Sequence, residues 1–109
     1  MIEITVFHSS QGICAFSLKG HSGYAEEGAD IVCAAVSSIA QYIIEAVVHT
    51  MKVPSCYECR DGFISLSLAQ TATNQQKQRV QDFLIPFETV MRQLSSQYKN
   101  YLKICSLEV

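Results

Sequence analysis

The feature that most constrains the fold is the apolar run in residues 31–48, which Gln41 and Glu45 interrupt four positions apart. The run approaches the length of a membrane span, but these two polar residues share one helical face and give it a hydrated edge. We therefore expect a helix over residues 30–51, apolar on most sides, in the centre of a globular domain and outside any membrane. Pro54 follows its end, as is common after a helix C-terminus.

Short segments on either side of this helix have the alternating or β-branched pattern of strands. They lie at residues 2–7, 13–19, 57–60, 63–68 and 101–107. Asp61-Gly62 joins the third and fourth segments, and this dipeptide strongly favours a tight hairpin. The short polar stretch between the first two segments predicts a second hairpin.

A second helix is predicted by apolar residues at three- and four-residue spacing. These residues are Val80, Phe83, Leu84, Phe87, Met91, Leu94 and Tyr98. Thr73 and Gln76, which precede this pattern, have the spacing of a capping box. Pro86 either kinks the helix or marks the start of its ordered part.

The predicted elements follow the order strand, strand, helix, strand, strand, helix, strand, or ββαββαβ. Half-buried strands and few helices predict a single α/β domain of the α+β type over residues 1–109. Its sheet is expected to be antiparallel-rich, with about five strands covered by two helices.

The composition limits the possible function classes. With 49% hydrophobic and 17% charged residues, the chain is globular and not disordered. A net charge of −2 argues against a broad nucleic-acid surface, which would need clustered Lys and Arg. Residues 1–7 lack the pattern of a secretion signal, and five cysteines are an odd number. We therefore expect a cytoplasmic chain with reduced thiols and no direct nucleic-acid partner.

The residues that could carry chemistry lie in a glycine-rich segment and in the helix that follows it. Asp30 is expected to be the N-cap of this helix, because its carboxylate can accept bonds from free amides. This choice puts Cys33 at the third helical position, where free amides and the helix dipole favour a thiolate. Gly20 and Gly23 lie beside His21 and allow the chain to fold back, so that His21 approaches Cys33.

Two interpretations of this pair remain open from the residues alone. In the first, Cys33 is the nucleophile of an enzyme, and His21 acts as a base and then as an acid toward the leaving amine. In the second, His21 is a surface-loop residue, and Cys33 packs as a small buried side chain.

Residues 20–37 also carry a resemblance to a known family. They contain Gly-His-Ser-Gly-Tyr-Ala-Glu-Glu-Gly followed by Asp-Ile-Val-Cys-Ala-Ala-Val-Ser, which resembles the signature of the ribosomal-processing cysteine proteases, known as Prp. The resemblance covers the whole chain in length and element order. It implies a cysteine endopeptidase that removes the N-terminal extension of a bacterial large-subunit ribosomal protein precursor, L-twenty-seven. It also implies a homodimer in which His21 is the catalytic histidine and Cys33 the nucleophile.

The resemblance places two further residues in the site, Asp30 and Ser37. Asp30 either orients His21, as the third member of a triad does, or only caps the helix. Ser37 lies one helical turn beyond Cys33 on the same face. It either contacts the substrate or His21, or is a small residue that allows close packing.

The other cysteines are expected to have no catalytic role, and no metal or cofactor is predicted. Cys56 and Cys59 form an isolated Cys-x-x-Cys without a second pair of zinc ligands, and they flank a strand instead of opening a helix. Cys14 and Cys105 are expected to be packing residues in strands. Two rival functions remain: a non-catalytic ribosome-assembly or protein-interaction module, and a thiol redox protein that uses Cys56 and Cys59.

Overall fold

The computed structural model describes residues 1–20 and 27–109, with the side chains of residues 1–20 and 31–109. Its elements are β1 (Ile2–Ser9), β2 (Gly12–Lys19), α1 (Glu27–Ile44), η1 (Glu45–Thr50), β3 (Ser55–Arg60), β4 (Phe63–Leu68), α2 (Asn74–Arg79), α3 (Gln81–Gln97) and β5 (Leu102–Glu108). All five predicted strands are present, and their ends agree to within two residues. The element η1 is a π-helix that continues α1 directly.

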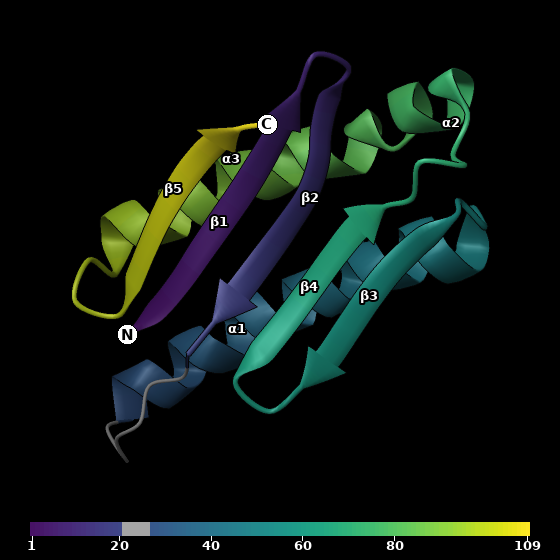
Figure 1. Ribbon diagram of the computed structural model, residues 1–109. Coiled ribbons are helices and arrows are strands. Elements are labelled where there is room, and N and C mark those ends of the chain that lie inside the picture. Colours follow the sequence, from purple (N-terminus) through teal and green to yellow (C-terminus); the bar gives the residue numbers. More distant parts are fainter. Residues whose placement is uncertain (21–26) are drawn as a thin grey trace.

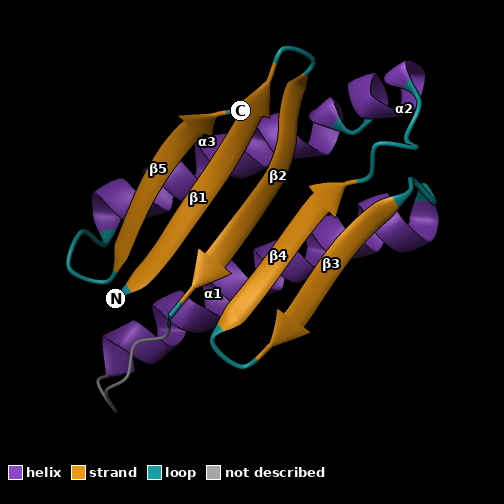
Figure 2. Ribbon diagram, in the orientation of Figure 1, coloured by secondary structure: helices purple, strands orange, loops and turns teal. Residues whose placement is uncertain are grey.

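The five strands form one mixed sheet in the order β3-β4-β2-β1-β5. Neighbouring strands are antiparallel except β1 and β5, which are parallel and place Ile2 opposite Leu102. Figures 1 and 2 show α1 and α3 side by side on one face of the sheet, while the other face carries no helix. The predicted antiparallel-rich sheet covered by two helices is confirmed. Strand β5 is parallel because α2 and α3 carry the chain back along the sheet before it begins.

The core lies between the sheet and the two long helices. In β1, Ile4 and Val6 are fully buried on the side that faces the helices. Glu3, which lies between Ile2 and Ile4, is exposed. The rings of Phe16 in β2 and Phe87 in α3 have centroids 4.3 Å apart, which packs α3 against the sheet. Burying a large apolar side chain contributes about 1.5–3 kcal/mol to folding, so this layer supplies most of the stability.

The first helix begins earlier than the sequence predicts. It starts at Glu27, so Asp30 lies in its first turn, and the prediction that Asp30 is the N-cap is wrong. Cys33 is consequently in the second turn and not at the third position. The reason is that Gly28 costs only about 1 kcal/mol inside a helix, while acidic residues in a first turn are favoured by the helix dipole.

The exposure of α1 and η1 fits a core helix. Val36 and Val47 are fully buried, and Gln41 and Glu45 are exposed as predicted. By length and composition alone, Ile31–Thr50 is also apolar enough to cross a membrane, with a mean hydropathy of 1.9. In this fold its buried side packs into the core beneath the sheet.

The second predicted helix is divided in two at Val80. The predicted capping box is present, since the Thr73 side chain accepts a bond from the Gln76 amide and Gln76 bonds the Thr73 amide in return. Pro86 lies inside α3, which begins at Gln81, so the alternative that Pro86 marks the start of the ordered helix is wrong.

A buried glutamine lies directly after the division. Gln81 Oε1 accepts from Ile13 N at 2.9 Å, and Gln81 Nε2 donates to Ile13 O at 2.9 Å and to Lys77 O at 3.0 Å. The side chain therefore pairs with both backbone groups of one residue in β2. This contact attaches the β1–β2 hairpin to the start of α3.

We expect Gln81→Ala to lower the free energy of unfolding by about 2–4 kcal/mol, because it leaves two buried backbone groups without partners. Urea denaturation monitored by circular dichroism measures the change. Gln93→Ala, at an exposed position of the same helix, is the matched control and should change stability by less than about 0.5 kcal/mol. Equal stability of the two variants would show that the Gln81 contacts contribute nothing.

A partly buried glutamate joins α3 to the strands at the β1–β5 edge. Glu88 Oε2 accepts from His8 Nε2 at 2.9 Å and from Ser106 Oγ at 2.7 Å, and Arg92 NH2 lies 3.7 Å away. Arg92 also donates to Ser106 Oγ. Burial raises the pKa of Glu88, but the bonds from His8 and Ser106 and the positive charges of His8 and Arg92 lower it by more, so this pKa lies below its ordinary value.

We expect Glu88→Gln to be less stable than the wild type at pH 7, by about 1 kcal/mol. A carboxyl whose pKa is lowered by folding adds stability above its unfolded pKa and loses this contribution as pH falls through its folded pKa. The difference in unfolding free energy between the wild type and Glu88→Gln should therefore disappear below about pH 4, near the ordinary pKa of glutamate. Urea denaturation at pH 7 and pH 3 measures it, with exposed Glu3→Gln as control. A difference that is the same at both pH values would contradict the charge-based explanation.

Candidate active site

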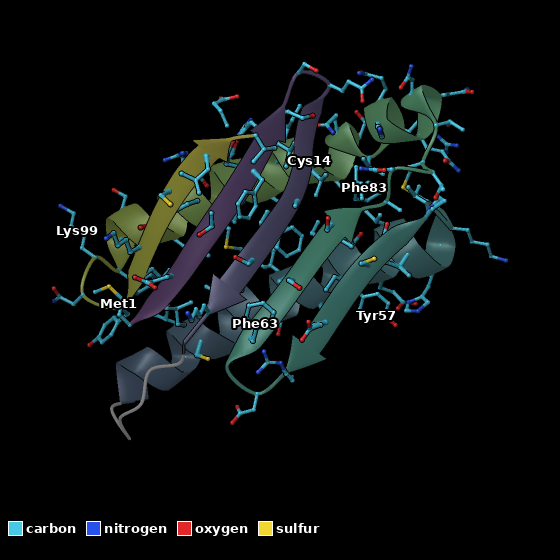
Figure 3. All side chains as sticks on the ribbon, in the orientation of Figure 1. Met1, Cys14, Tyr57, Phe63, Phe83 and Lys99 are labelled. Carbon is cyan, nitrogen blue, oxygen red and sulfur yellow. The ribbon has the colours of Figure 1, made fainter. Side chains whose placement is uncertain are left out.

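A cavity of about 360 Å³ lies where the end of β2, residues 33–41 of α1 and the β3–β4 turn meet. Figure 1 shows these three parts at the same end of the sheet, and Figure 3 places Met1 and Phe63 at this end. The sheet contributes an apolar floor from Ile2, Leu18 and Ile64. One wall comes from α1, and the β3–β4 turn forms the opposite rim.

The α1 wall is made of three polar residues at four-residue spacing, Cys33, Ser37 and Gln41. This spacing puts them on one face of the helix. Cys33 and Ser37 are partly buried, and Gln41 is exposed. The side chains of Val32 and Val36, one residue earlier in each turn, are buried in the core and fix the rotation of the helix. Cys33 and Ser37 are therefore held beside each other on an accessible surface.

Gly20 ends the β2 side of the cavity. Its φ is +97°, and its amide donates to Gly62 O at 2.9 Å, which ties the end of β2 to the β3–β4 turn. A Cβ atom at this position would lie 2.6 Å from Met1 O, which is backbone and cannot rotate away. The position accordingly requires glycine, both for its backbone conformation and for its close approach to β1.

The structure locates only part of the predicted site. It brings Gly20, Cys33 and Ser37 to one cavity. His21 and Gly23 lie outside the described residues. Asp30 lies in the first turn of α1, and its side chain is also outside the described part.

The rim formed by the β3–β4 turn is a part of the site that the sequence analysis missed. It consists of residues 59–63 and includes a guanidinium and a carboxylate, from Arg60 and Asp61. Arg60 Nε donates to Glu58 Oε2 at 3.1 Å, and its guanidinium carbon lies 4.7 Å from the centre of the Phe63 ring. No sequence signal locates this turn beside Cys33, since the contact depends on the pairing of β2 with β4. Gln41 was detectable, because it continues the spacing of Cys33 and Ser37.

The remaining cysteines do not form a second reactive centre in the part of the chain that the structure describes. All five cysteines are free. Cys56 and Cys59 are both exposed within β3, and residues three apart on a strand point to opposite faces, so this pair cannot chelate one metal ion. Cys14 Sγ lies 3.5 Å from Phe7 O. Cys105 is exposed, so the prediction that it is a packing residue is wrong.

Among residues 1–20 and 31–109, whose side chains the structure describes, no group of three or more His, Cys, Asp or Glu residues able to hold a metal ion occurs. The helical wall of the cavity therefore offers a thiol, a hydroxyl and a carboxamide, and the facing β3–β4 turn offers charged groups and a second thiol, that of Cys59. A thiol on the wall of an open cavity is suited to nucleophilic attack on a bound substrate.

Comparison with known proteins finds a matching family over most of the chain. Residues 1–103 match the family described as Cysteine protease Prp. The ribosomal processing cysteine protease Prp of Bacillus subtilis (strain 168) is 25% identical over 111 residues, covering 95% of this chain and 96% of that protein.

Two solved structures have the same fold. SMU.848 from Streptococcus mutans superposes with a TM-score of 0.83 at 25% identity and covers 100% of this chain and 96% of its own. The ribosomal processing protease Prp from S. aureus, in complex with a substrate peptide, gives a TM-score of 0.74 at 20% identity, covering 97% and 99%. The whole chain therefore adopts the architecture of these proteins.

Proposed function

This chain belongs to the cysteine protease Prp family, and from this membership we propose that it removes the N-terminal extension of the L-twenty-seven precursor, with Cys33 as nucleophile and His21 as its acid–base partner. The observation that carries the proposal is the position of Cys33, partly exposed on the wall of the cavity. Gly20 lines the same cavity, and His21 is the next residue in the chain.

The proposed reaction has two stages. His21 takes the proton of the Cys33 thiol, and the thiolate attacks the carbonyl carbon of the scissile peptide bond. His21 then gives this proton to the leaving amine, and an acyl-enzyme remains on Cys33. In the second stage His21 deprotonates a water molecule, which attacks the acyl carbon and releases the carboxylic acid and the Cys33 thiol.

The position of Cys33 decides how its thiolate is produced. The effect of the helix dipole falls off within the first turn, and Cys33 lies in the second turn of α1. Proton transfer to His21 must therefore supply most of the activation. Ser37, one turn further along the same wall, is proposed to contact the substrate or His21.

The two rival functions have less support. A non-catalytic ribosome-assembly module does not require a thiol on an accessible cavity wall, and the family is one of cysteine proteases. A redox role for Cys56 and Cys59 conflicts with their position within a strand.

We further propose that the protein acts in the cytoplasm as a homodimer without a direct nucleic-acid partner. The unpaired cysteines suit a reducing compartment, and the net charge of −2 does not favour binding to phosphates. Large apolar side chains on the outer side of α1, Ile31 and Tyr42, are 65% and 66% exposed and provide candidate contacts between copies. Sedimentation velocity tests this point. A wild-type chain that sediments as a monomer at micromolar concentration would contradict it.

The experiment that tests the proposed activity is incubation of the purified protein with a peptide spanning the precursor's processing region. Mass spectrometry should find two product peptides whose masses correspond to cleavage of one peptide bond. Alkylation of the protein with iodoacetamide beforehand should prevent this cleavage. Absence of cleavage under reducing conditions, with the full-length precursor as well as the peptide, would overturn the proposal.

A further inference from the structure

The cavity extends well beyond the proposed nucleophile along the α1 wall. Gln41 lies eight residues after Cys33 on the same face, which corresponds to about 12 Å along the helix axis. Its side chain is exposed, and among the described residues no hydrogen bond to it is found. A carboxamide both donates and accepts hydrogen bonds, so Gln41 presents an unused recognition group at the end of the cavity away from Cys33.

The surroundings of Gln41 favour an uncharged partner. Arg60 and Asp61 place both signs of charge on the opposite rim, so a charged substrate group entering the cavity meets a like charge as well as an opposite one. Of the two polar residues one turn from Gln41 on the same face, Ser37 is neutral and lines the cavity, while Glu45 lies outside the cavity lining and is bonded to His49 Nδ1 at 2.8 Å. A neutral side chain with a donor and an acceptor avoids this repulsion and can pair with the Gln41 amide.

Building on the proposed protease function, we propose that Gln41 is a specificity-determining residue that binds an uncharged polar side chain of the substrate, such as Asn, Gln, Ser or Thr. An extended peptide advances about 3.3 Å per residue, so a span of about 12 Å corresponds to three or four residues from the scissile bond. The α1 wall is then the track along which the peptide lies, with the thiol at one end and the Gln41 amide at the other.

The test is a positional-scanning peptide library built on the precursor's processing region and cleaved by the wild type, Gln41→Glu and Gln41→Leu. Mass spectrometry of the products gives the preference at each position. The wild type should prefer uncharged polar residues at one position three or four residues from the cut. Gln41→Glu should shift this position toward Lys and Arg by roughly two- to fivefold, the range of an exposed ion pair. Gln41→Leu should remove the polar preference.

Two controls keep the test specific. Gln93→Glu makes the same change at an exposed position of α3 that does not line the cavity, and it should leave every preference unchanged. Thermal unfolding should show that both Gln41 variants fold, since this side chain is exposed. Cleavage by the Gln41 variants with unaltered preferences would overturn this inference and leave the proposed function intact. A wild type that cleaves nothing would overturn the proposed function and, with it, this inference.

Discussion

Cys33→Ala is expected to lower kcat/KM for the precursor peptide by about 10⁴-fold or more, because it removes the atom that forms the acyl-enzyme. The melting temperature should change little, since only one partly buried sulfur is lost. Cys33→Ser should be almost as inactive, because a hydroxyl is far harder to deprotonate than a thiol. Initial rates measured by mass spectrometry, with circular dichroism to confirm folding, test this expectation.

The matched control for this result is Cys59→Ala. Cys59 also lines the cavity but lies on the β3 side, away from the helix that carries Cys33. Its removal should change kcat/KM by a few-fold at most. Full activity of Cys33→Ala would show that Cys33 is not the nucleophile, and loss of activity in Cys59→Ala alone would assign the reaction to the opposite wall.

The elements that the sequence predicts correctly are those fixed by local chemistry. Asp61-Gly62 specifies a tight hairpin because Gly62 adopts a φ of +78°, and the two strands around it pair as expected. The capping box at Thr73 and Gln76 depends on two side chains three residues apart, so it too is visible in the sequence. In both cases the determining contacts lie within a few residues.

The features that the sequence does not predict depend on contacts between distant residues. The division of the second helix coincides with Gln81, whose partner Ile13 is 68 positions away. The start of α1 was misplaced because Asp30 satisfies the preference for a cap, and equally the preference for an acidic residue in a first turn. Local preferences of similar size cannot choose between two starts three residues apart.

The same distinction applies to the candidate site. The helical spacing of Cys33 and Ser37 predicts that they share one face, and both line the cavity. The opposite rim at Arg60 and Asp61 depends on the pairing of β2 with β4, which one sequence does not reveal. The helical wall of the cavity follows from local periodicity, and the opposite rim follows only from the order of strands in the sheet.

Gly20→Ala is expected to impair both stability and activity. Residue 20 has a φ of +97°, which is unfavourable for alanine. The new methyl group would also lie 2.6 Å from Met1 O, so β1 or the end of β2 must move. We expect the free energy of unfolding to fall by about 2–4 kcal/mol from these two effects together. Movement at residue 20 also displaces the residue that follows it, His21. A shift of about 1 Å can cost roughly 100-fold in rate, so kcat/KM of the folded fraction should fall by a similar factor.

Gly12→Ala separates the loss of stability from the loss of activity. Gly12 also has a positive φ, +109°, and its new Cβ would lie 2.7 Å from Gln81 Cδ, but it begins β2 and is remote from the cavity. Urea denaturation should show both variants to be destabilised. Peptide cleavage measured below both melting temperatures should be impaired only in Gly20→Ala. If the two variants lose the same activity per folded molecule, Gly20 contributes only to the stability of the strand. The geometry at the end of β2 then does not position His21.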